Sequence, residues 1–162
     1  MIEIEKPNID CIEQGDNYGK FVVEPLERGF GTTLGNAMRR ILLSSLPGVA
    51  VTGVRIEGVL HEFATIPGVK EDVTDIILNL KAVRALLFTD DPKTIRISAK
   101  GPGKVTAGDI IQDPEFEVLN PDQLIATLDK TAELEMEMKL EHGRGYVFSE
   151  KNKTPGAPIG II

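Results

Sequence analysis

Apolar and charged residues alternate without a break over residues 132–141, and this is the clearest pattern in the chain. Leucine or methionine occupies every second position from 134 to 140, between four glutamates and a lysine. Because successive side chains of a strand point to opposite faces, this period of two predicts a half-buried strand with a solvated acidic face. Residues 94–100 alternate similarly before a Gly-Pro-Gly turn, and residues 20–24 and 50–56 are rich in strand-forming side chains. Strands are therefore expected to dominate the fold.

Residues 34–46 follow the period of a helix instead. Two threonines directly before the segment are suitable N-caps, and a Pro-Gly pair ends it. At about 100° per residue, one face of this helix is apolar. Its members are Leu34, Ala37, Met38, Ile41, Leu42 and Ser45. Leu43 falls on the opposite side with Arg39 and Arg40, so the pattern predicts two separate contacts, one for each face.

A second helical period covers residues 69–83. The apolar stripe of this segment consists of Val69, Val73, Ile76, Ile77 and Leu80. Leu78 falls on the polar side, near Glu71 and Asp75. Each predicted helix thus carries one leucine on the side that would face solvent in a monomer, which indicates further protein contacts.

The composition is that of a folded protein, with 41% hydrophobic residues, 27% charged residues and a mean hydropathy of -0.04. Eighteen Lys and Arg residues stand against 25 Asp and Glu residues, which gives a formal net charge of -7. An acidic surface repels a phosphate backbone, so we do not expect this portion to bind DNA or RNA by bulk electrostatics.

Cysteine usage and the chain start indicate the compartment. The single cysteine, Cys11, cannot form an internal disulfide, and no Cys/His cluster predicts zinc. The first residues lack the basic start and apolar stretch of a secretory signal. No apolar run approaches the ~18 residues that a membrane-spanning helix needs. We expect a cytoplasmic protein without metal, cofactor or membrane association.

The patterns that could indicate catalysis are incomplete. The spacing of Gly29, Gly31 and Gly35 fits neither a dinucleotide-binding fingerprint nor a phosphate loop, and a turn followed by close helix packing explains these glycines better. The His-Glu pair at position 61 lacks the second histidine of a zinc-protease motif, because Thr65 stands in its place. We therefore predict no catalytic residue in this chain.

Residues 142–146 form a His-Gly-Arg-Gly-Tyr corner after the best predicted strand. Two interpretations stay open, a turn at the strand end or a binding corner that presents Arg144 and Tyr146. The polar segment 149–158, rich in Lys, Pro and Gly, predicts a mobile loop. The apolar residues 159–162 look like the beginning of a strand, so we expect a chain that has been cut short.

Four segments in order carry a resemblance to a known family. They are LERGFGTTLGNAMRRILLSSLPG at residues 26–48, GVLHEF at 58–63, EDVTDIILNLK at 71–81 and HGRGYV at 142–147. Together they closely resemble the bacterial RNA polymerase alpha subunit, and the resemblance covers essentially the whole chain.

The resemblance implies an α+β fold in which a helix lies on the sheet of a dimerisation subdomain and a mostly-β subdomain is inserted. Residues 1–48 would form the first half of the dimerisation subdomain, 49–158 the insert, and 159–162 the start of a truncated return. In the family the subunit forms a homodimer, one copy contacts the β subunit and the other contacts β′, and the larger subunits carry the chemistry.

Site residues carry over position by position. The implied dimerisation residues are Leu34, Ala37, Met38, Ile41 and Leu42. The implied β-subunit residues are Arg39, Arg40, Leu43, Glu71, Asp75 and Leu78. Two alternatives to a scaffold remain at this point: a regulatory decoy that binds the same partners, and a small-molecule enzyme with a pocket near residues 29–35 and Arg144. The enzyme lacks any complete catalytic constellation, which makes it the weakest of the three.

Overall fold

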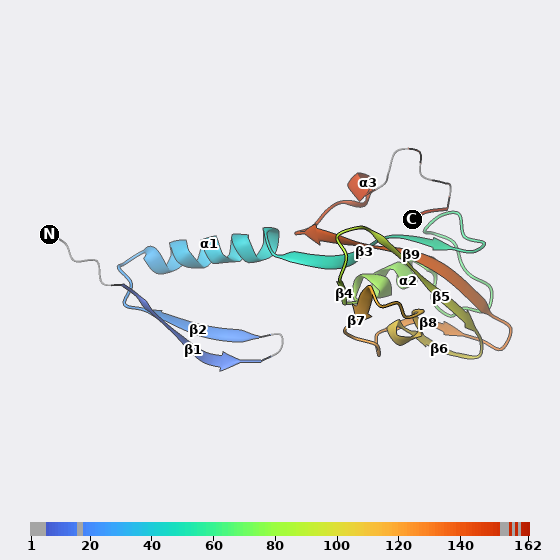
Figure 1. The fold of residues 1–162 in the computed structure, drawn as a ribbon, viewed down its shortest axis with the longest axis horizontal. Helices are drawn as coiled ribbons and strands as arrows, with labels where there is room; N and C mark the ends of the chain where they lie inside the picture. Colours follow the sequence, from blue (N-terminus) through green and yellow to red (C-terminus); the bar gives the residue numbers. More distant parts are fainter. Residues whose placement is uncertain (1–5, 16–17, 153–155, 157, 159) are drawn as a thin grey trace. The chain divides into compact units, whose positions relative to one another are not determined.

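Two units make up the chain in the computed structural model, Met1–Ser45 and Leu46–Ile162 (Figure 1). The structure describes residues 6–15, 18–152, 156, 158 and 160–162. Strands and helices occur in both units, and the sheets are antiparallel, so the predicted α+β class is confirmed. Each unit is described by itself below.

The first unit consists of a hairpin and a helix. Strands β1 (Asn8–Gln14) and β2 (Gly19–Glu24) pair in antiparallel register, with an irregularity between Cys11 and Glu13. Helix α1 (Phe30–Ser44) begins four residues before the predicted start, and neither preceding threonine caps it. The N-cap is Gly29, whose φ of 91° lies in the left-handed region that glycine reaches without strain. The helix therefore starts where this glycine turns the chain.

The second unit is built on a three-stranded sheet. Its strands are β3 (Pro47–Ile56), β9 (Glu133–Arg144) and β5 (Lys93–Lys100), in the order β3-β9-β5. The predicted alternation in β9 is confirmed, because its leucines and methionines are all buried. On the opposite face Glu137 pairs with Arg96 at 2.8 Å and with Arg55 at 3.8 Å. One face of this sheet therefore packs on the core of the second unit, and the opposite face carries ion pairs.

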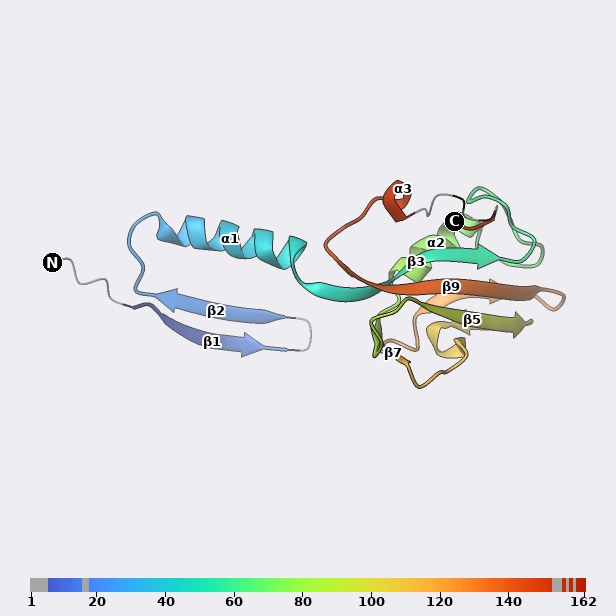
Figure 2. The same cartoon turned by 45° about the horizontal axis from the view of Figure 1, so that its top comes forward.

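Shorter elements surround that sheet, as Figures 1 and 2 show. They are α2 (Val73–Lys81), β4 (Ala85–Leu87) paired with β7 (Phe116–Val118), β6 (Gly103–Thr106) paired with β8 (Leu124–Leu128), the 3-10 turn Ala107–Asp109, and α3 (Ser149–Asn152). Helix α3 replaces the beginning of the predicted loop 149–158, so that part of the prediction was wrong. Residues 153–155 and 157 lie outside the described residues.

Helix α2 is shorter than predicted, because Asp72 caps it and the chain before that residue takes another path. The Asp72 carboxylate accepts a hydrogen bond from the Asp75 amide at 2.7 Å. Val69, expected on the helix, instead forms a bridge with Leu128. Val73, Ile76 and Leu80 lie in the same buried cluster as the inner face of β9.

The last described residues run along β3. The Val54 and Ile162 main chains exchange hydrogen bonds of 2.8 and 2.9 Å, and Ile161 bridges Arg55. The Ile162 side chain packs against the core of the second unit. The assignment of residues 159–162 to a returning dimerisation subdomain stays a prediction, and Ile159 lies outside the described residues.

Candidate functional site

Helix α1 presents its predicted apolar face to the surroundings. The exposed fractions are 40% for Leu34, 48% for Met38, 51% for Ile41 and 53% for Leu42. Ala37 is exposed as well, and no residue of the helix is buried. Phe30, four residues before Leu34, extends the same face and is 57% exposed. It was missed because the helix was expected to start later. The result is a row of exposed apolar side chains along one face of the helix.

The hairpin of the first unit is apolar and exposed too. Ile9 is opposite Val23 and Cys11 is opposite Phe21, so these side chains share one face. Ile9 is 66% exposed and Phe21 is 59% exposed. Within its described part, residues 6–15 and 18–45, this unit contains no buried residue. Large exposed apolar surfaces are typical of sites where proteins, membranes or ligands bind.

The other side of α1 carries Arg39, Arg40 and Leu43, all exposed, with Leu43 at 72%. Ile41 and Leu43 are two positions apart, which places them about 200° apart around the helix axis. The ion pairs between described residues involve neither arginine. The helix therefore has two chemically different faces, one mainly apolar and one with cationic groups around a leucine.

The predicted site residues of the α2 region separate into two kinds. Asp75 and Leu78 are exposed, and Leu78 keeps 57% of its surface. Glu71 is half-buried and precedes the helix, and its two carboxylate oxygens accept hydrogen bonds from the amide and hydroxyl of Thr127 at 2.6 and 2.9 Å. The structure brings Asp75 and Leu78 to the surface, and it engages the Glu71 carboxylate inside the unit.

The corner after β9 is a turn at the end of the strand, which is one of the two interpretations of its sequence, and its role in binding stays a prediction. Gly145, with a φ of 64°, ends the strand directly after Arg144. Tyr146 is 77% exposed and stacks edge-on against Phe148, with ring centroids 5.4 Å apart. The ring nitrogen Nε2 of His142 lies 2.9 Å from the Thr89 carbonyl oxygen, which gives this histidine a local structural contact. The corner is a strand-end turn that also displays two aromatic rings.

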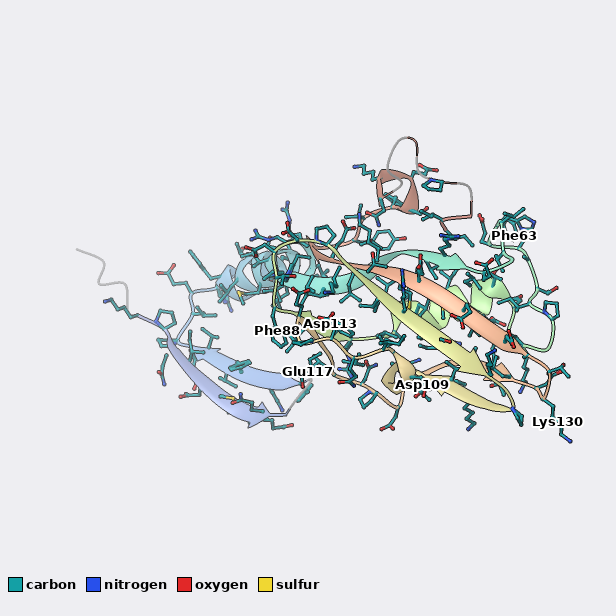
Figure 3. The ribbon with its side chains drawn as sticks, turned by 45° about the vertical axis from the view of Figure 1, so that its right-hand side comes forward. Phe63, Phe88, Asp109, Asp113, Glu117 and Lys130 are labelled. Atoms are coloured by element: carbon teal, nitrogen blue, oxygen red, sulfur yellow. The ribbon has the colours of Figure 1, made fainter. Side chains whose placement is uncertain are left out.

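Several exposed aromatic side chains of the second unit were missed in the sequence, among them Phe63 and Phe88. Phe63 is 81% exposed on the segment before α2, and Figure 3 labels it at the surface. The neighbouring Leu60 is 68% exposed. These two positions are three apart, but a single pair is too short to define a helical or strand period, so no sequence pattern identified them.

Features that point to small-molecule chemistry are weak. A Cβ added at Gly31 or Gly35 would meet nothing within 4 Å apart from its chain neighbours and the nearby backbone of its own helix, so these glycines form no tight cradle. A hollow on the outer face of the β3-β9-β5 sheet is lined by paired charges, among them Arg55, Arg96 and Glu137. Among the described residues, no cluster of three His, Cys, Asp or Glu side chains is arranged to hold a metal ion. No helix in the same described part is long and apolar enough to cross a membrane.

Known proteins show the family directly. The RNA polymerase Rpb3/RpoA insert domain model matches residues 54–162. The chain is 65% identical to the DNA-directed RNA polymerase subunit alpha of Alkaliphilus metalliredigens and of Desulfitobacterium hafniense, and 63% identical to that of Moorella thermoacetica. Each alignment covers 100% of this chain and 52% of the relative, so the chain spans about half the length of the curated relatives it matches. The predicted resemblance is confirmed, and the chain belongs to the RNA polymerase Rpb3/RpoA insert domain family.

Proposed function

We propose that the protein is a non-catalytic scaffold subunit of DNA-directed RNA polymerase that dimerises and recruits the β and β′ subunits in the cytoplasm. The observation that carries the proposal is the two-faced helix α1, found in a chain that is similar to alpha subunits over its whole length. The phosphodiester chemistry would then belong to the larger subunits, and this chain would need no cofactor.

The apolar face of α1 is proposed as the dimer contact. Two copies of this helix can pair through the same residues, because a twofold axis brings one patch against its own copy. The members of the patch are Phe30, Leu34, Ala37, Met38, Ile41 and Leu42. Covering a large aliphatic side chain completely contributes about 1.5–3 kcal/mol, so a partly exposed row of this size supports a stable pair.

The opposite face of α1 is proposed as the contact for β. Arginine is enriched among interface hot spots, and an exposed leucine beside it offers apolar area that a partner can bury. Arg40 and Leu43 supply this combination, with Arg39 beside them. The exposed α2 residues Asp75 and Leu78 form the second proposed contact with the large subunits, and Arg144 and Tyr146 form a third.

Alanine substitution at Arg40 and Leu43 together tests the proposal. In the full-length protein, R40A/L43A should lose capture of purified β subunit, with a loss of about 2 kcal/mol or more for each anchor, or about thirtyfold in affinity. The dimer should persist, because neither side chain belongs to the apolar face. The measurement is a titration of β against the immobilised protein.

The matched control is R55A/L119A, which truncates an exposed arginine and an exposed leucine of the second unit. This variant should bind β as the unsubstituted protein does. The proposal is wrong if R40A/L43A captures β normally, or if the control loses β to the same extent.

A further inference from the structure

The segment before α2 lies along the edge of β8 that faces away from β6. The Lys70 amide donates to the Thr127 carbonyl oxygen at 3.0 Å, and the Asp129 amide donates to the Gly68 carbonyl oxygen at 2.8 Å. The Thr127 amide, on the N-terminal side of these two bonds along β8, donates to the Glu71 carboxylate. The side chain of Glu71 therefore takes the place that a main-chain acceptor has in an ordinary strand pair.

Both oxygens of the Glu71 carboxylate accept a hydrogen bond from Thr127. One oxygen accepts from the Thr127 amide at 2.6 Å and the other accepts from the Thr127 hydroxyl at 2.9 Å. Hydrogen bonds to a charged acceptor are stronger than those between neutral groups. Exchanging them for a contact with another protein would leave the half-buried Thr127 amide without its acceptor, which carries a desolvation cost.

Two more side chains hold α2 at its flanks. The Asn79 side-chain amide donates to the Ile125 carbonyl oxygen of β8 at 3.0 Å. The Thr74 hydroxyl donates to the Glu62 carbonyl oxygen at 2.9 Å. Asn79 and Thr74 lie on opposite flanks of the helix, about 140° apart around its axis. Together with Glu71 at the start, they fix the rotation of α2 about its own axis.

This fixed rotation determines what α2 displays. A helix of nine residues is marginal by itself and depends on its surroundings for its position. With Val73, Ile76 and Leu80 buried, Asp75 and Leu78 must face outward. A rotation by the 100° of a single residue would replace them with different side chains.

We infer that Glu71 is a positioning residue, which binds β8 and thereby holds α2 in the rotation that presents Asp75 and Leu78 to a large polymerase subunit. The inference rests on the proposed function for its partner, and it gives Glu71 a different role from the direct contact expected from the sequence. The charge of Glu71 then matters only as an acceptor for Thr127.

Glutamine and alanine at position 71 separate the two roles. In E71Q the side-chain oxygen accepts from the Thr127 amide and the new amide group donates to the Thr127 hydroxyl, so both bonds persist without the charge. We expect E71Q to bind purified β and β′ within threefold of the unsubstituted protein. E71A should bind about tenfold more weakly, since both bonds are lost. Equal losses in E71Q and E71A would overturn the inference and indicate a direct charge contact.

Substitutions at Thr127 provide the second test if E71A folds poorly. T127V removes the hydroxyl bond and T127S retains it. T127V should therefore weaken binding of the large subunits, and T127S should bind them as the unsubstituted protein does. The double variant E71A/T127V should bind no more weakly than E71A, because both changes remove the same interaction. Additive losses would contradict the inference.

Two measurements distinguish a failure of the proposed function from a failure of this inference. Binding of L78A tests the proposed contact, and amide hydrogen exchange tests the positioning role of Glu71. If L78A binds both large subunits normally, α2 is not their contact and the proposed function loses that surface. The positioning role is then tested by amide hydrogen exchange in the protein without partners. E71A should speed the exchange of the Thr127 and α2 amides at least tenfold, and E71Q should leave these rates unchanged. Unchanged exchange in E71A would overturn the inference whatever L78A shows.

Discussion

Gly101 shows how closely single positions of the second unit are packed. A Cβ atom at this position would lie 1.7 Å from the Asp129 carbonyl oxygen, whereas a Cβ at the nearby Gly103 would meet nothing within 4 Å. The Gly101 amide also donates to the Ala132 carbonyl oxygen at 2.9 Å, which holds the two chain segments together. Only glycine permits that approach.

We therefore expect Gly101→Ala to lower the free energy of unfolding by about 3 kcal/mol, because a clash with a main-chain oxygen must displace the backbone. Urea unfolding followed by circular dichroism is the measurement. The control is Gly103→Ala, which should change the free energy of unfolding by less than about 1 kcal/mol. Similar values for the two variants would show that the close approach at Gly101 does not exist in solution.

The ionisation of Asp129 makes the stability of the second unit depend on pH. Hydrogen bonds from the Thr131 amide and hydroxyl, at 2.8 and 3.0 Å, hold the pKa of the Asp129 carboxyl below its ordinary value of 3.8. A carboxyl whose pKa is lower in the folded state stabilises the fold above its unfolded pKa, and this contribution disappears as the pH falls through the folded value.

The expected result is a melting temperature that falls below about pH 4, and less steeply in Asp129→Asn than in the unsubstituted protein. Asp129 is exposed, so the difference between the two proteins should be small. Thermal unfolding at a series of pH values between 3 and 7 measures it. A steeper acid slope in the asparagine variant would contradict this assignment.

At the scale of elements, the sequence predicts the faces of helices and strands better than their ends. The buried face of β9 follows directly from side-chain periodicity, because burial repeats with the geometry of the strand. The ends depend on local backbone choices. Gly29 starts α1 early by turning left-handed, and the bridge between Val69 and Leu128 removes the first turn expected for α2.

The role of Glu71 could not be predicted from the sequence at all. Its partner Thr127 lies 56 positions away, and no periodicity links two such residues. The sequence motif identified Glu71 as part of a family segment, but only the fold shows what its carboxylate binds. In general, a sequence pattern cannot identify hydrogen bonds between residues that lie far apart along the chain.

The cap of α2 supports a prediction at this scale. Asp72→Ala removes the acceptor for the Asp75 amide and should lower the free energy of unfolding by about 1 kcal/mol. Asp72→Asn retains a side-chain oxygen at the cap and should change stability by only a few tenths of a kcal/mol. Urea unfolding of both variants tests this, and equal losses would show that the negative charge, rather than the cap, is what stabilises the helix.

At the scale of the whole molecule, the two units differ in how many apolar side chains they bury. The second unit buries a continuous cluster, whereas the described part of the first unit buries none. The sequence predicted apolar faces in both, and it could not show which faces the chain covers itself. This difference is the physical reason for proposing a second copy and the large subunits as partners of the first unit.

The central claim is that α1 dimerises through one face and leaves the opposite face free for β. Ile41→Asp and Leu43→Asp place the same charge on the same helix, about 200° apart. The most direct measurement is the molar mass of each full-length variant by light scattering after size-exclusion chromatography. Ile41→Asp should give a monomer, because it brings an unpaired charge into the dimer contact, and Leu43→Asp should retain the mass of a dimer. A dimer in both variants, or a monomer in both, would contradict the two-faced account of α1.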